Sequence, residues 1–282
     1  MKFVYIYLCL SCLILCACED EIAEGRALWD QTVTSRVDGQ EPAMADVDPE
    51  FLETLDAHGG LGRWRAFTAV SFLLRDFPTG DGERTLADFH RVDLRTRNQN
   101  IEGENYRIVS RGDSTWISPG VAVTGIPPRM YNNASFYLFG MPFVFGDPGL
   151  SVEHAGTTTF RSETLEQFDV TVPDDTGDGG NDYRIYVDPQ THQLRYGAWT
   201  VSYPAVADLE LHQVARFDDW QTVNGMLVPA AITLFTKEGE EPTADTPGAP
   251  IYFERVAFSD RAFSASIFER PPGTVADRSH LR

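Results

Sequence analysis

Apolar and polar residues alternate along most of the chain from Phe67 onward, and this pattern predicts a β-rich domain. Short alternating segments separated by turns that carry Gly and Asp, with few helices between them, are typical of an antiparallel sheet or barrel. The predicted strands are 68–75, 84–94, 105–110, 114–118, 183–187, 198–203, 209–220, 230–236 and 251–258.

A helix is predicted just before the strands, at 48–58. Asp48 can cap its N-terminus, Pro49 fits its first position, and Gly59 supplies the left-handed residue that ends it. His58 lies in the last turn, where the helix dipole favours a basic side chain, and this structural role is preferred to a catalytic one. A short second helical turn follows at 61–64.

One segment, 132–145, breaks the β pattern because it is almost wholly apolar and aromatic. At helical spacing Phe136, Phe139 and Phe143 share one face. Two interpretations stay open: a helix buried in the core, or a helical lid that covers a concave sheet and leaves room for a lipid.

The first eighteen residues predict an exported and lipidated protein. Lys2 precedes an apolar run, 3–15, that is shorter than the ~20 residues a spanning helix needs. Ala17 then precedes Cys18, an arrangement that resembles the lipobox of bacterial lipoproteins, in which this cysteine is acylated and becomes the new N-terminus. Two or more acyl chains would anchor the protein stably. The alternative is an ordinary secretory peptide cleaved nearby.

After the leader, the sequence predicts two further regions, a tether and a folded domain. All four cysteines lie in the leader, 1–17 with Cys18, so the remainder can form neither a disulfide nor a cysteine-based metal site. Residues 18–47 are polar and acidic and predict a flexible tether. Residues 48–282 are long enough to bury a core of their own and predict the folded domain.

The net charge of −19 argues against nucleic acid as a partner, because phosphate contacts require clustered Lys and Arg. The acidic run 19–21 follows the anchor cysteine and resembles outer-membrane sorting signals and some surface-export signals. We therefore expect attachment through Cys18 to the periplasmic face of the outer membrane, with the cell surface as the alternative.

Four segments, in chain order, resemble proteins of the LolA/LolB-like superfamily of outer-membrane lipoprotein carriers. They are an Ala-His-Gly-Gly-Leu opening followed by Trp64, a strand that enters an Asp-Pro-x-Thr turn, two strands joined by Asn-Gly, and a closing Phe-x-x-Pro-Pro-Gly. The resemblance covers about residues 48–275 and is closest to an uncharacterised envelope lipoprotein family of this superfamily. The segments are 57–64, 183–191, 217–229 and 267–273.

The resemblance implies an α+β fold: a curved, half-open antiparallel β-sheet, or incomplete barrel, with helices packed on the concave face. In the carriers this cavity takes acyl chains, although this chain is anchored and carries longer insertions at 147–182 and 237–250. Trp199 and Trp220 are expected in the core or the cavity wall. The candidate residues of the cavity and lid are Trp64, Phe72, Trp116, Phe136, Phe139, Met141 and Phe143.

No sequence pattern predicts an enzyme, a cofactor or a metal site. Nucleophile elbows, phosphate-binding loops and zinc-protease motifs are absent, and no two of the six histidines have metal-ligand spacing. The acidic turn 174–182 resembles the first half of a Ca²⁺ loop, but Ile185 stands where a bidentate acid should close it. An acidic turn leading into the next strand is the preferred interpretation.

The expected function is therefore non-enzymatic: an anchored envelope lipoprotein that binds a lipid or acyl chain between sheet and lid. The membrane, through the anchor, and an envelope protein are the expected partners. The alternative is a protein-interaction or envelope-stress-sensing module whose cavity is filled by its own side chains. A continuous cavity of at least ~300 Å³ would favour ligand binding.

Overall fold

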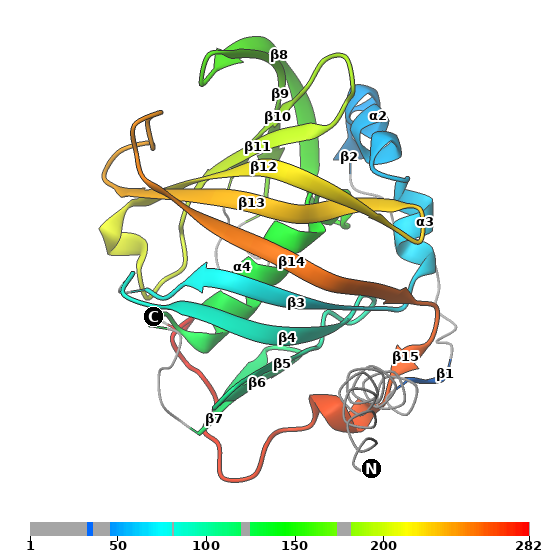
Figure 1. The fold of residues 1–282 in the computed structure, drawn as a ribbon, viewed down its shortest axis with the longest axis vertical. Coiled ribbons are helices and arrows are strands. Elements are labelled where there is room, and N and C mark those ends of the chain that lie inside the picture. Colours follow the sequence, from blue (N-terminus) through cyan, green and yellow to red (C-terminus); the bar gives the residue numbers. More distant parts are fainter. Residues whose placement is uncertain (1–32, 36–45, 81, 120–124, 174–181, 282) are drawn as a thin grey trace, which may run out of the picture.

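One large antiparallel sheet wraps around a central helix in the computed structural model, which describes residues 33–35, 46–80, 82–119, 125–173 and 182–281 (Figure 1). The strand order is β2-β8-β9-β10-β11-β12-β13-β14-β3-β4-β5-β6-β7, and β1 pairs separately with β15. The first half of the chain contributes β1 (Val33–Ser35), β2 (Asp46–Val47), β3 (Ala69–Pro78), β4 (Thr85–Asp93), β5 (Gln99–Gly103), β6 (Arg107–Arg111) and β7 (Ser114–Ser118). The second half contributes β8 (Ser151–Phe160), β9 (Glu163–Thr171), β10 (Tyr183–Val187), β11 (Leu194–Thr200), β12 (Leu211–Val223), β13 (Met226–Glu238), β14 (Gly248–Ser259) and β15 (Ala262–Phe263).

Two meanders make up this sheet, and a single seam joins them. In β3–β7 and in β8–β14 each strand pairs with the next along the chain, whereas β14 returns to pair with β3 at Leu73↔Glu254. Among the described strands, only the short β2 runs parallel to its neighbour, β8. The strand order ends at β2 on one side and at β7 on the other, so the sheet stays open. The predicted fold class, a curved half-open antiparallel sheet in an α+β domain, is confirmed.

In the part of the chain that the structure describes, three α-helices accompany the sheet: α2 (Pro49–Ala57), α3 (Leu61–Ala66) and α4 (Pro128–Gly140). The predicted cap of α2 is confirmed, because the Asp48 carboxylate accepts a hydrogen bond of 2.8 Å from the Glu50 N–H. The described short 3₁₀ helices are η1 (Phe143–Gly146), η2 (Ala207–Leu209) and η3 (Ala265–Phe268).

Aromatic side chains fill the space between α4 and the sheet. In Figure 1, α4 lies behind β14 and β3, across the hollow of the sheet. Phe139 of α4 stacks on Phe72 of β3 with ring centroids 4.3 Å apart. Next to them Phe143 stacks on Trp64 of α3 at 4.7 Å. These rings are buried and belong to one hydrophobic cluster, which holds the helices against the concave face.

Two of the segments that resemble the carrier superfamily contact one another. Gly59 has a φ of 109°, and a Cβ there would lie 2.4 Å from the Gly225 carbonyl oxygen in the β12–β13 turn. The Leu227 N–H donates a 2.8 Å hydrogen bond to the His58 carbonyl. Glycine is therefore required at 59 both by backbone conformation and by space.

The structure corrects several predicted boundaries. The helix predicted over 132–145 instead spans 128–140, because Pro142 lacks the N–H that would continue it. β11 ends at Thr200 rather than Tyr203. The hairpin β8–β9 occupies a region for which no strand was predicted. Most residues of β8 alternate between half-buried and exposed, and the two strands are rich in Thr and Glu, so the apolar signal is weak.

Candidate functional site

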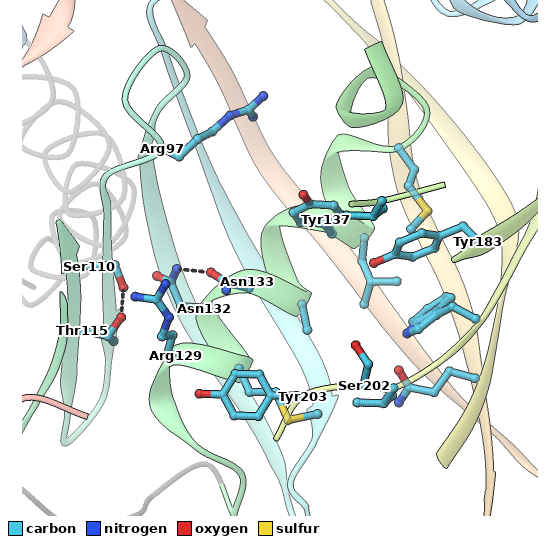
Figure 2. Close-up of a pocket in the computed structure, with 18 of the residues that line it drawn as sticks. Arg97, Ser110, Thr115, Arg129, Asn132, Asn133, Tyr137, Tyr183, Ser202 and Tyr203 are labelled. Atoms are coloured by element: carbon cyan, nitrogen blue, oxygen red, sulfur yellow. Dashed lines mark hydrogen bonds between the residues drawn. The ribbon is translucent and has the colours of Figure 1, made fainter. Parts of the chain in front are cut away.

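A cavity of about 300 Å³ lies beside α4. Figure 2 shows α4 passing between the two walls, with Ser110 and Thr115 on one side and Tyr183 on the other. The α4 residues that line it are Arg129, Met130, Asn132, Asn133, Ala134, Tyr137 and Leu138, and Met141 follows at the end of the helix.

The sequence of α4 gives the helix two different faces. Met130, Ala134, Tyr137 and Met141 recur at intervals of three or four and line the cavity. The other face carries buried residues, three of them aromatic, that pack on the sheet: Tyr131, Ser135, Phe136 and Phe139. This helix therefore closes the core with one face and forms a cavity wall with the other.

The apolar wall is made mainly by β10 and β11. Tyr183 and Trp199 are cross-strand partners, so their side chains share one face of the sheet, with ring centroids 5.6 Å apart. Tyr137 of α4 lies parallel to Tyr183 at 6.4 Å. Gly197 lets Met141 approach β11, because a Cβ at this position would lie 3.3 Å from the Met141 sulfur.

The polar wall is made by β6, β7 and the first half of α4. The Ser110 and Thr115 hydroxyl oxygens lie 2.8 Å apart in a buried pair. The Asn132 side-chain N–H donates to Asn133 Oδ1 at 3.2 Å. Asn132 is 2 % exposed, and its Oδ1 has no hydrogen-bond partner among the described residues. A buried acceptor without a partner is uncommon in folded proteins.

Two arginines, Arg97 and Arg129, are among the residues that line the cavity. Arg97 donates to the Asp147 carboxylate at 2.7 Å, and its guanidinium lies 4.8 Å from the centre of the Phe136 ring. Burial raises the pKa of Asp147, although the Arg97 guanidinium acts in the opposite direction. The backbone N–H of Arg129 donates to the Asp277 carboxylate at 3.0 Å, which ties the start of α4 to the segment after η3.

A buried polar cluster lies on the sheet side of α4, away from the cavity lining. The Asp88 carboxylate contacts His90 Nε2 at 2.7 Å and accepts from the Tyr131 hydroxyl at 2.7 Å and from the Tyr106 hydroxyl. Burial raises the pKa of both tyrosines, and the Asp88 charge adds to this effect. A buried carboxylate–histidine pair can serve catalysis, but none of these four residues lines the cavity. The cluster therefore fits an internal connection between β4, the turn before β6 and α4.

His58 is fully buried at the end of α2 rather than exposed to a ligand. Its Nδ1 contacts the Thr54 carbonyl at 2.8 Å, and its ring meets the edge of Trp220 at 4.7 Å. Burial lowers the pKa of His58 to about 4, although the hydrogen bond to Thr54 acts in the opposite direction. His58 therefore has a structural role, but as a buried neutral imidazole and not as the dipole-favoured basic side chain that the sequence predicted.

The structure divides the residues that the sequence marks for the cavity and lid. Met141 lines the cavity. Trp116 is half-buried on β7 and alternates with Thr115, which places its side chain on the opposite face of that strand. The other five are buried in the core cluster beneath α4: Trp64, Phe72, Phe136, Phe139 and Phe143.

Sequence reasoning missed the polar wall. Asn132 and Asn133 open the segment that was interpreted through its aromatic residues alone. Two adjacent amides at the start of an apolar helix were the available signal, since amide side chains are seldom buried without a partner. Arg129 and the Ser110–Thr115 pair carried no local signal, because they meet only when α4 crosses β6 and β7.

Several predictions fall outside the described residues, namely the lipidated Cys18 and most of the acidic turn 174–182. Within the described ranges, no three His, Cys, Asp or Glu side chains are grouped so that they could hold a metal ion. No helix in this part of the chain has the length and apolar character required to cross a membrane.

No family model matches the sequence, and no curated protein is similar to it. Among solved structures, the chain is similar to a LolA superfamily protein from Nitrosomonas europaea, with 12 % identity over 78 % of this chain and 96 % of that one, and a TM-score of 0.47. It is also similar to a DUF1329 family protein from Desulfovibrio piger, with 10 % identity over 80 % of this chain and 98 % of that one, and a TM-score of 0.48. A third similar structure is a Vibrio parahaemolyticus domain described as an outer-membrane lipoprotein-sorting protein, with 9 % identity over 73 % of this chain and 89 % of that one, and a TM-score of 0.42.

Proposed function

We propose that this protein binds a hydrophobic ligand, a lipid or an acyl chain, in the cavity between α4 and the sheet. The observation that carries the proposal is the apolar wall of Tyr183, Trp199 and Met141 around about 300 Å³ of space. Ligand pockets range from ~300 to 1,000 Å³ and are lined by aromatic and apolar groups with a few polar ones. This cavity has that composition and lies at the lower end of that range.

The rest of the proposal comes from the sequence. The leader and Cys18 support an anchored envelope lipoprotein at the periplasmic face of the outer membrane, with the cell surface as the alternative. Such a protein would work beside its supply of lipid and would bind it without chemical change. The anchor is tested by replacing Cys18 with Ala and following labelled palmitate, and label that stays on the variant would rule out Cys18 as the attachment site.

A second candidate function is supported by the buried face of α4. Phe136, Phe139 and Phe143 fill the concavity beneath the helix with the protein's own side chains. A protein-interaction or envelope-stress-sensing module with a self-filled interior would have the same core. The two functions differ in whether the space on the other side of α4 takes a ligand.

A substitution that fills the cavity separates the two functions. Ala134 is half-buried on the cavity face of α4, so Ala134→Phe should occupy the space that a ligand would take. The purified full chain is titrated with N-phenyl-naphthylamine, whose fluorescence rises in apolar surroundings. Ala57→Phe is the matched control, because Ala57 is also half-buried on a helix but lies outside the cavity lining.

The wild-type protein and Ala57→Phe should bind the probe, and Ala134→Phe should lose most of this binding. Mass spectrometry of small molecules that co-purify with the wild-type chain should identify an amphiphile that is depleted from Ala134→Phe. Equal probe binding by all three proteins, or none by the wild type, would reject this cavity as the site and favour the interaction module.

A further inference from the structure

The polar wall of the cavity contains a hydrogen-bond acceptor that the protein leaves unused. Asn132 lines the cavity and is 2 % exposed, and its side-chain N–H donates to Asn133 Oδ1. Asn132 Oδ1 has no hydrogen-bond partner among the described residues. A buried acceptor without a partner lowers stability, so a ligand group that donates a hydrogen bond at this point would restore the lost interaction.

The same wall contains a hydroxyl pair whose donors are only partly used. The Ser110 and Thr115 hydroxyl oxygens lie 2.8 Å apart, and both residues are buried and line the cavity. Each hydroxyl carries one hydrogen, and the single hydrogen bond between them uses only one of the two. In Figure 2, Asn132 lies on the side of α4 that faces this pair. The wall therefore presents both an acceptor and a donor to a ligand.

The two arginines of this wall are already engaged, so neither is free to bind a charged ligand. Arg97 donates to the Asp147 carboxylate at 2.7 Å. Arg129 lies beside the Asp277 carboxylate, which accepts from its backbone N–H at 3.0 Å, and it takes part in a further interaction. The described lining residues include neither Asp nor Glu. Because burying a charge without a partner is costly, the wall disfavours a head group of either sign.

From these groups we infer that the ligand is a single-chain lipid with an uncharged head that carries a hydroxyl, as in a monoacylglycerol. This inference rests on the function proposed above. A hydroxyl both donates and accepts. It can donate to Asn132 Oδ1, while the same hydroxyl or an adjoining ester carbonyl accepts from the Ser110–Thr115 pair. The apolar wall takes the chain, and a cavity of about 300 Å³ lies at the small end of the range for ligands, which favours one chain over two or three.

Displacement of N-phenyl-naphthylamine from the purified full chain tests this inference, at about pH 8, where a carboxylate is ionised. The competitors share one chain and differ in the head. Monododecanoylglycerol carries hydroxyls, methyl dodecanoate accepts hydrogen bonds but cannot donate them, and dodecanoate and dodecyltrimethylammonium are charged. Monododecanoylglycerol should bind ~2- to 10-fold more tightly than the methyl ester, as expected for one neutral hydrogen bond. It should bind ~10-fold or more tightly than either charged compound, because their charges would be buried without a partner.

The outcomes separate the inference from the proposed function. If methyl dodecanoate or either charged compound binds as tightly as monododecanoylglycerol, the inferred head group is wrong while the cavity remains a hydrophobic site. If none of the compounds displaces the probe, the proposed function itself fails. Dodecanol, which has a hydroxyl but no ester, shows whether the hydroxyl alone is sufficient. Tighter binding of either hydroxylated compound than of the methyl ester supports the inference.

Variants of the polar wall then assign the contacts. Asn132→Leu removes the acceptor and should abolish the preference for monododecanoylglycerol over methyl dodecanoate. The double variant Ser110→Ala/Thr115→Val removes both hydroxyls and should weaken these two esters alike by ~2- to 10-fold. Thr54→Val is the control, because Thr54 is buried on α2 with a hydroxyl that has no partner among the described residues, and it lies outside the lining. This control should bind every compound as the wild type does.

Circular dichroism identifies the variants that fold. If Asn132→Leu does not fold, the double variant decides the question, because Thr115→Val keeps the side-chain volume and Ser110→Ala removes a single oxygen atom. The inference is overturned if every folded variant of the polar wall binds the compounds with wild-type affinities.

Discussion

Acid sensitivity at His58 is a direct test of the packing described for α2. The imidazole is fully buried between Thr54, Trp220 and Phe143, and its Nε2 has no hydrogen-bond partner among the described residues. Protonation would place a charge in this apolar contact. His58→Gln removes the titrating group, so the part of the pH dependence that comes from His58 should disappear in the variant.

The expected size of the effect follows from the two pKa values. Burial lowers the pKa of His58 from 6.5 to about 4 in the folded protein. The unfolded chain therefore binds the proton first as the pH falls, and stability is lost between these two values. Above pH ~6.5 the stability is fully present. At ~1.4 kcal/mol per pKa unit, the loss is ~2 kcal/mol by pH 5 and ~3 kcal/mol once the pH is below 4.

Urea unfolding at about pH 7.5 and about pH 5 measures this difference. The free energy of unfolding of the wild type should fall by ~2 kcal/mol more than that of His58→Gln. His212→Gln, which removes a half-buried histidine on β12, should fall as the wild type does. If the wild type and His58→Gln lose equal stability between the two pH values, His58 does not have the lowered pKa that its burial implies.

Two further substitutions test the fold. Gly59→Ala places a Cβ 2.4 Å from the Gly225 carbonyl oxygen at a position where φ is 109°, so thermal unfolding should show that the variant loses ~1–3 kcal/mol of stability. Gly82→Ala, where the added Cβ meets open space, should lose less stability. Equal losses in the two variants would contradict the close contact at Gly59. Asp88→Asn replaces a carboxylate that accepts hydrogen bonds from two tyrosines, and urea unfolding should show a loss of ~2–5 kcal/mol of stability. The exposed Asp219→Asn should lose ~0.5 kcal/mol or less. If Asp88→Asn also loses little stability, the Asp88 charge does not hold the buried cluster together.

Short sequence patterns correctly predicted the helix ends and strands that depend on residues close together in the chain. The cap and stop of α2 depend on Asp48, Pro49 and Gly59, which stand beside the helix they delimit. Strands with strong alternation were found as well. The hairpin β8–β9 was missed because most of its residues face solvent or are only partly buried, and its Thr and Glu residues give little apolar contrast.

The sequence predicted a cavity beside the apolar segment 132–145, but most of the residues predicted to line it do not. The aromatic residues of 136–143 were expected to form a cavity or lid, and most of them instead fill the core beneath α4. Tyr137 is part of the same segment and reaches the cavity because it lies on the opposite face of the helix. Its neighbours Tyr183 and Trp199 become adjacent through the register of β10 and β11. Register and helix rotation depend on long-range packing, which no single window of sequence contains.

The seam between β3 and β14 also has a consequence for how the chain reaches this structure. Within each meander, strands pair with near neighbours in sequence, whereas the seam joins Leu73 to Glu254 across most of the chain. Contacts of such large sequence separation form slowly, since the entropy of closing the loop is lost before the pairing is gained. Until the seam forms, Phe72 on β3 and Phe253 on β14 face water, and such intermediates are prone to aggregate. Folding of this protein should therefore depend on chaperones that keep the partly folded chain from aggregating until both meanders are available to pair.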